Sequence, residues 1–108
     1  MRLDTFFALE RPAETPDGGG GQLRSWEVVG RLWGALTPST GREAALGDRP
    51  SARVTHRITF RRAKEPDARP KPEQRLVSRG RVFAIRAVAD AGPPGKYLTV
   101  FAEEGPFS

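Results

Sequence analysis

The clearest pattern in the sequence is an alternation of apolar and polar positions, which predicts β-strands. In residues 25–37 the even positions form the more apolar face. In residues 52–62 one face of the predicted strand consists of Ala52, Val54, His56, Ile58 and Phe60. The other face of that strand consists of Arg53, Thr55, Arg57, Thr59 and Arg61. Each segment therefore predicts a strand with one face toward a core and the other toward solvent or a neighbouring subunit.

Further strands are predicted at residues 6–11, as a pair within residues 75–90, and at residues 96–104. The pair flanks a turn at Ser78, Arg79 and Gly80. Glycines inside the 25–37 strand, at positions 30 and 34, indicate sharp curvature or a close approach of another chain segment. About six short strands predict a mainly all-β fold, either a small closed barrel or a sandwich, because closure leaves few unpaired edges.

Long connections separate these strands within what we interpret as a single domain, residues 1–108. Residues 12–22 contain four consecutive glycines and predict a flexible hairpin loop. In the second connection, residues 38–51, Thr40 and Glu43 fit a capping box and predict one short helix. The third, residues 63–74, is rich in proline and charge and predicts another loop.

Composition narrows the classes of function. The formal net charge is +5, and 15 of the 18 basic residues are arginine, which suits either proximity to a polyanion or a solvated basic surface. The absence of cysteine excludes a disulfide framework, a thiolate zinc site and a cysteine nucleophile. No stretch has the pattern of a signal peptide or a membrane span, so we expect a protein of the cytosol or of a particle assembled there.

Catalytic chemistry has little support. His56 is the sole histidine and lies on an apolar strand face, where we expect a core imidazole held by a hydrogen bond. We expect Glu103 and Glu104, at the end of the last strand, to be solvated rather than paired for acid–base catalysis. The chain is therefore not expected to be an enzyme or to hold a cofactor or a metal.

Two features favour binding. The row of Arg53, Arg57 and Arg61 suits phosphate contacts, but it lacks the interleaved aromatic residues on which bases stack. Trp33 falls on the polar face of its strand, where a large aromatic residue serves as an interface anchor or lies beneath the loop at 12–22 or 63–74.

The order and spacing of several motifs resemble those of the phage head–tail joining proteins, also called head-closure or stopper proteins. These motifs are LERP (9–12), DGGGG (17–21) with Trp26, LWGALTPSTGRE (32–43), VTHRITFR (54–61), RLVSRGRVFAIRAV (75–88) and YLTVFAEE (97–104). Two stretches depart from the family pattern. The segment after Gly-Arg-Glu is short, and residues 63–74 are unusually rich in proline and charge.

The resemblance implies a β-barrel subunit of the neck of a tailed phage or of a phage-like gene transfer agent. It implies a homo-oligomeric ring of six or twelve copies, below the portal and adaptor ring and above the tail terminator or tail tube. Such a stopper retains packaged double-stranded DNA through sequence-independent contacts, offers a docking surface to the tail and has no contact with a membrane. The particle would be assembled in the host cytoplasm.

By motif position, the resemblance implies that residues 38–51 form the loop that lines or gates the channel. The residues that would face the channel are Ser39, Thr40, Gly41, Arg42 and Glu43. The residues expected at subunit contacts are Trp33, Arg53, Arg57 and Arg61. Two alternatives remain open, an adaptor or tail-completion protein of the same neck and a free-standing basic β-barrel that binds nucleic acid.

Overall fold

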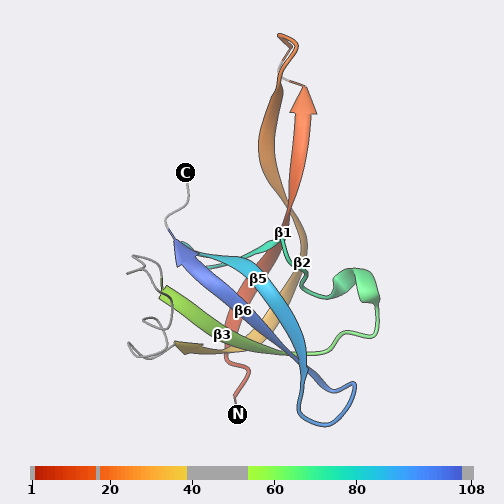
Figure 1. Ribbon diagram of the computed structural model, residues 1–108, viewed down its shortest axis with the longest axis vertical. Helices are drawn as coiled ribbons and strands as arrows, with labels where there is room; N and C mark the ends of the chain where they lie inside the picture. The colour runs from red at the N-terminus through yellow and green to blue at the C-terminus, as the bar shows by residue number, and fades with distance from the viewer. Residues whose placement is uncertain (1, 17, 39–53, 106–108) are drawn as a thin grey trace.

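The computed structural model describes residues 2–16, 18–38 and 54–105. Within these residues six antiparallel strands close into a barrel, in the order β1-β2-β3-β6-β5-β4 (Figure 1). The strands are β1 (Thr5–Pro16), β2 (Gln22–Pro38), β3 (Val54–Arg61), β4 (Arg75–Ser78), β5 (Arg81–Ala91) and β6 (Tyr97–Gly105). The predicted mainly all-β fold is confirmed, and of the two predicted architectures the structure is the closed barrel.

The hydrophobic core fills the barrel interior. Its fully buried members come from every strand except β2: Phe7, Leu9, Ile58, Phe60, Leu76, Phe83, Ile85, Val100 and Ala102. The rings of Phe60 and Phe83 each pack edge-on against Phe7, at centroid distances of 5.5 and 5.8 Å. The alternation predicted for β3 is confirmed where the structure describes side chains, because His56, Ile58 and Phe60 are buried whereas Arg57 is exposed.

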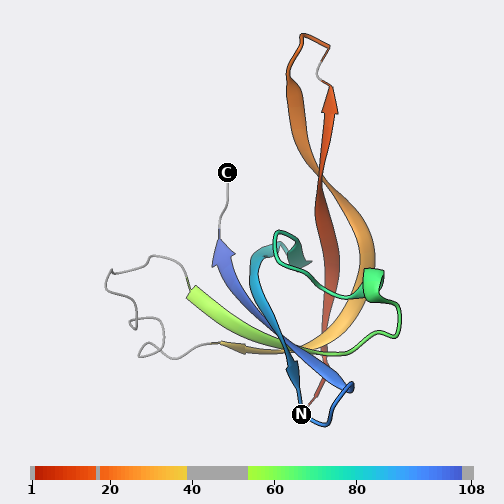
Figure 2. The ribbon, with the colours of Figure 1, turned by 45° about the vertical axis from the view of Figure 1, so that its right-hand side comes forward.

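Strands β1 and β2 continue beyond the barrel as a two-stranded arm (Figure 2). The loop expected over residues 12–22 is wrong in its extent. Strand β1 runs to Pro16 and β2 begins at Gln22, so the strands are joined through residues 17–21. The sequence predicts that the first strand ends before Pro12, but the ladder continues because Pro12 pairs with Trp26 and Pro16 with Gln22.

A β-bulge changes the register of the arm where it meets the barrel. Leu9 pairs with Gly30 and Glu10 pairs with Val28, which leaves Val29 as the extra residue of β2. The bulge reverses the predicted parity, since Val29 packs against the core and Val28 is 45% exposed. The prediction of an apolar even face is therefore right for Leu32 and Leu36 and wrong for Val28.

Two glycine positions are explained by geometry. A Cβ at Gly34 would lie 2.6 Å from Cε1 of Phe60, which confirms the predicted close approach. The predicted turn between β4 and β5 is confirmed, with Arg79 at φ 51° and Gly80 at φ 78°. Two successive positive φ angles are typical of a type I′ turn, whose twist matches that of the flanking strands.

The connection from β3 to β4 crosses one end of the barrel. It contains the 3-10 turn η1 (Pro66–Ala68), and Pro70, two residues after the turn, is buried. Arg69 holds the segment together by donating from Nε to the backbone oxygen of Ala63 at 2.7 Å. The short helix predicted within 38–51 lies outside the described residues, and no helix in the described part of the chain is long and apolar enough to cross a membrane.

Candidate functional site

The outer face of the β1–β2 ribbon carries all the large hydrophobic side chains that are exposed in the described residues. These are Phe6, Val28 and Trp33, at 45%, 45% and 56% exposure. Phe6 and Trp33 are cross-strand partners whose ring centroids lie 4.8 Å apart. The exposure of Trp33 rules out the alternative that it lies beneath a loop. Exposed apolar residues gathered on one face, rather than scattered singly, are typical of an interaction surface.

A groove of about 420 Å³ lies beside this aromatic pair. Its lining includes Phe6, Trp33, Val77 and the side chains of Arg31 and Arg79. Both arginines are exposed, and neither has an ion-pair partner among the described residues. The groove thus combines aromatic surface with two cationic groups and the acidic residue Asp4, a chemistry that suits a partner presenting apolar and charged side chains.

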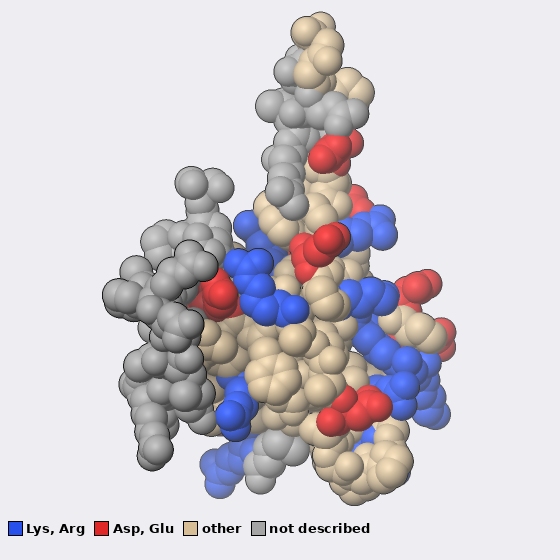
Figure 3. All heavy atoms as spheres, in the orientation of Figure 1, with Lys and Arg blue, Asp and Glu red and all other residues tan. Residues whose placement is uncertain are grey.

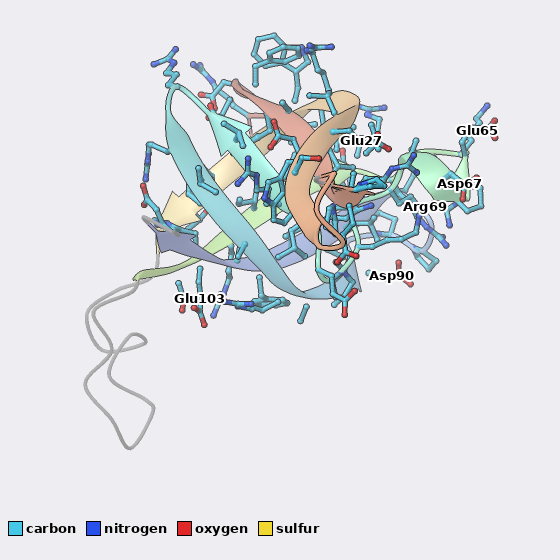
Figure 4. The ribbon with its side chains drawn as sticks, turned by 90° about the horizontal axis from the view of Figure 1, so that it is seen from above. Glu27, Glu65, Asp67, Arg69, Asp90 and Glu103 are labelled. Carbon is cyan, nitrogen blue, oxygen red and sulfur yellow. The ribbon has the colours of Figure 1, made fainter. Side chains whose placement is uncertain are left out.

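The arginine row on β3 is a separate feature. Arg57 and Arg61 are exposed on the outer face of the strand, as the alternation predicts, whereas Arg53 lies outside the described residues. Figure 3 shows blue and red side chains interspersed over the visible face of the barrel rather than a continuous basic surface. Acidic groups lie on opposite sides of the molecule, with Glu65 just before η1, Asp67 within it and Glu103 across the barrel (Figure 4). This distribution favours local contacts over one phosphate-binding track.

Three of the motifs meet in a cluster of charged side chains at one end of the barrel. The Nε2 atom of His56 lies 2.8 Å from Oε1 of Glu104, and the guanidinium of Arg81 donates to both carboxylate oxygens at 2.7 and 2.8 Å. The His56 ring also packs edge-on against Phe83, with centroids 5.3 Å apart. The predicted hydrogen bond to His56 is therefore confirmed, and the cluster ties β3, β5 and β6 together.

Electrostatics determine the roles within this cluster. Hydrogen bonds from Arg81, with a smaller contribution from His56, lower the pKa of Glu104 to about 2. The carboxylate is ionised at neutral pH and can only accept, so Nε2 of His56 carries the hydrogen and donates it. Glu103 and Glu104, which we expected to be solvated, are partly exposed, with 30% and 24% of their side chains accessible, and both also have cationic partners. Glu104 is held by two partners, and Glu103 lies 3.4 Å from Arg86.

The cluster stands close to the ends of the predicted channel segment. His56 pairs with Pro38, the last residue of β2, and Val54 pairs with Glu104. The predicted channel residues, Ser39, Thr40, Gly41, Arg42 and Glu43, lie outside the described residues. The structure therefore describes the base from which that segment departs.

No group of residues in the described part of the chain has the composition of a metal site. The Arg81–Glu104–His56 cluster joins side chains of three strands by hydrogen bonds. These hydrogen bonds connect β3, β5 and β6.

Comparisons with known proteins agree with this architecture. A family model described as phage head completion protein matches residues 1–105. The chain belongs to the phage head completion protein family. A sequence search of curated proteins finds no match.

Two solved structures resemble this head completion protein. One is a chain of the virion of a native gene transfer agent particle, with 36% identity, a TM-score of 0.74, and coverage of 95% of this chain and 94% of that chain. The other is the solution structure of protein SF1141 from Shigella flexneri 2a, with 24% identity, a TM-score of 0.71, and coverage of 96% and 94%. The second likeness concerns the fold alone.

Sequence reasoning identified Trp33 and His56 but not their partners. Phe6 falls in a short apolar run, which does not show which face of the strand it occupies. The Arg81–Glu104–His56 cluster joins residues that are 23 and 48 positions apart in the sequence. The available signal was that all three members of the cluster lie inside motifs that resemble those of the head–tail joining proteins.

Proposed function

We propose that this head completion protein is a structural, non-enzymatic subunit of the particle neck, and specifically the stopper. In this role copies form a ring below the portal and adaptor, retain packaged DNA without reading its sequence and provide the docking surface for the tail. The observation that carries the proposal is the family match over residues 1–105. The likeness to a chain of a gene transfer agent virion supports a place in such a particle.

The surfaces of the barrel are consistent with assembly. A ring requires each subunit to contact its neighbours through two different faces. Strand β3 presents Arg57 and Arg61 on one part of the barrel, and the ribbon presents Trp33 on another. We assign both to contacts with neighbouring subunits or neck rings, together with Arg53.

The proposed channel segment begins at the end of β2. In this proposal Ser39, Thr40, Gly41, Arg42 and Glu43 lie nearest the channel, where Arg42 contacts DNA phosphate or a neighbour's carboxylate. The ordered base described above, with Arg81 and Glu104 beside it, gives such a segment a rigid support. Contacts to phosphate alone carry no sequence information, as a gate for any DNA end requires.

The test is electron microscopy of particles from producer cells that lack this gene, with nuclease-protected DNA measured on the same samples. We expect tailless heads that have lost their DNA, and re-expression of the intact chain should restore both tails and DNA. Tailed particles with full DNA would contradict a neck role. Tailless heads that keep their DNA would favour the adaptor or tail-completion alternative.

A further inference from the structure

Strand β2 has a long stretch whose outer edge pairs with no other strand in the described residues, although Asp67, Lys71 and Gln74 of the segment after β3 line a groove together with its residues 27–29. Strand β3 pairs with β2 from Gly34 to Pro38, and within the described residues no strand pairs with this edge over residues 25–33. The backbone hydrogen bonds shown by the segment after β3 go to Lys96, to Ile85 and to residues of the segment itself. A row of backbone donors and acceptors along such an edge is a template for another strand.

The exposed apolar side chains of β2 lie within this same stretch. Val28 and Trp33 face outward, with Arg31 between them. On their inner flank they have cross-strand partners from β1, but on their outer flank they have none. A strand added to β2 would place its own side chains against all three, because directly opposed residues in a sheet contact each other.

The opposite edge of the arm is protected against such pairing. Beyond Glu10, where β4 ends its ladder with β1, the β1 edge contains Pro12 and Pro16. Proline lacks the backbone N–H of a ladder and is a common means of blocking an edge strand. Residues 25–33 contain no proline, so of the two edges of the arm the β2 edge accepts a strand.

The chemistry of the stretch defines what would bind there. Val28 and Trp33 require apolar side chains opposite them, and Arg31 requires a carboxylate. Another open edge in this chain, residues 86–91 of β5, presents Arg86, Ala87 and Ala89 and no large exposed apolar side chain. A second copy that paired its β5 edge with residues 25–33 would therefore place no large apolar side chain opposite Val28 and Trp33.

We infer that residues 25–33 of β2 bind an extended segment of a different protein by strand addition, and that this segment alternates apolar and acidic side chains. The inference deepens the proposed neck role and rests on it for the source of the segment. Main-chain hydrogen bonds supply affinity in this mode of recognition, and alternate side chains supply specificity. The bound strand would complete the apolar surface around Trp33 and neutralise Arg31.

A peptide titration tests the inference on the full-length chain. The probe is acetyl-Thr-Val-Thr-Glu-Thr-Val-Thr-amide, followed by nuclear magnetic resonance of the ¹⁵N-labelled protein, with the Glu→Lys peptide as its control. We expect amide shifts and slowed hydrogen exchange concentrated in residues 25–33. The lysine peptide should bind about two- to fivefold more weakly, as expected for replacing an attractive cross-strand charge pair.

Two protein variants make the test specific. Arg31→Glu should reverse the preference between the two peptides. The matched control is Arg57→Glu, which changes an exposed arginine on β3, a strand flanked by β2 and β6 on its two edges, and should leave the preference unchanged. No response at millimolar peptide, a response centred on other strands, or equal binding of both peptides would overturn the inference.

A crosslink inside the particle separates this inference from the neck role. A benzoylphenylalanine side chain replaces Arg31, and purified particles are irradiated and analysed by mass spectrometry. A crosslink to an extended acidic segment of a different protein supports the inference. A crosslink only to a second copy of this chain, in particles that retain DNA and tails, would overturn the inference and leave the proposed neck role intact.

Discussion

At the scale of single residues, the ionised carboxylate of Glu104 is the clearest electrostatic feature. Its pKa is lowered from 4.5 to about 2 in the folded chain, chiefly by the Arg81 hydrogen bond. A lowered folded-state pKa stabilises the fold above the unfolded pKa, and the stabilisation is lost as the pH falls through the folded value. The stability contributed by Glu104 should therefore disappear between about pH 4.5 and pH 2.

We predict that Glu104→Gln lowers the free energy of unfolding at neutral pH by about 1.5–3 kcal/mol, the range for hydrogen bonds to charged groups. The difference from the unmodified chain should shrink as the pH falls from 4.5 toward 2. Urea denaturation at a series of pH values measures it. Glu14→Gln is the control, because Glu14 is exposed on the arm. A difference that is independent of pH would contradict the assignment of the charge to this cluster.

A second residue-scale prediction concerns the two glycines of β2. Gly34→Ala places a methyl group 2.6 Å from the Phe60 ring, and overpacking of this kind costs about 1–3 kcal/mol. Gly30→Ala is the matched control, because a Cβ there meets no atom within 4 Å. Thermal unfolding of both variants should show a loss for Gly34→Ala alone. Equal melting temperatures would mean that the core relaxes around the added methyl.

Trp33→Ala should weaken assembly more than it weakens the monomer. The ring is exposed and packs against Phe6, so its loss should lower the free energy of unfolding by only about 0.5–1.5 kcal/mol. Phe60→Ala, in the core, should cost about 3–5 kcal/mol. Urea denaturation and the fraction of tailed particles are measured for both variants. If Trp33→Ala lost stability as Phe60→Ala does, Trp33 would be a structural residue.

At the scale of elements, the junction of β2 and β3 tests the channel segment. Pro38 pairs with His56, so the strands on either side of the segment are already neighbours. Deletion of residues 39–49 leaves residues 50–53 as the connection, which is within the length of about 2–5 residues common in hairpins. We predict a folded barrel by circular dichroism and thermal unfolding, and particles that lose their DNA. Deletion particles with normal DNA retention would assign gating to another part of the neck.

At the scale of the whole molecule, net charge distinguishes a neck subunit from a free nucleic-acid-binding protein. The net charge is +5, but basic and acidic side chains are interspersed over the surface, and no aromatic residue lies between Arg57 and Arg61 on the outer face of β3. We predict that the isolated chain binds duplex DNA no more tightly than about 10⁻⁴ M at physiological salt, the weak end of non-specific binding. Fluorescence anisotropy at low and physiological salt measures this affinity. Tight binding that weakens steeply with salt would favour the nucleic-acid alternative.

The sequence by itself determined much of the barrel. Alternation in residues 52–62 predicts a strand with one buried face, since the side-chain period of a strand is two, and β3 has this face where the structure describes its side chains. The Ser78-Arg79-Gly80 turn and the outward position of Trp33 follow from the same local rules. Local patterns succeed here because each depends only on neighbours along the chain.

Only the tertiary structure decided the rest. Strand β1 continues through Pro12 and Pro16 because β2 pairs with it. The bulge at Val29 exchanges the inward and outward positions of β2 on its far side, whereas the sequence pattern predicts one unbroken alternation. Glu104 is ionised and paired because the barrel brings β5 and β3 to either side of β6. The open edge of β2 exists because β3 diverges from it at Gly34. These features depend on which strands become neighbours, and strand pairing is a long-range property that no local pattern specifies.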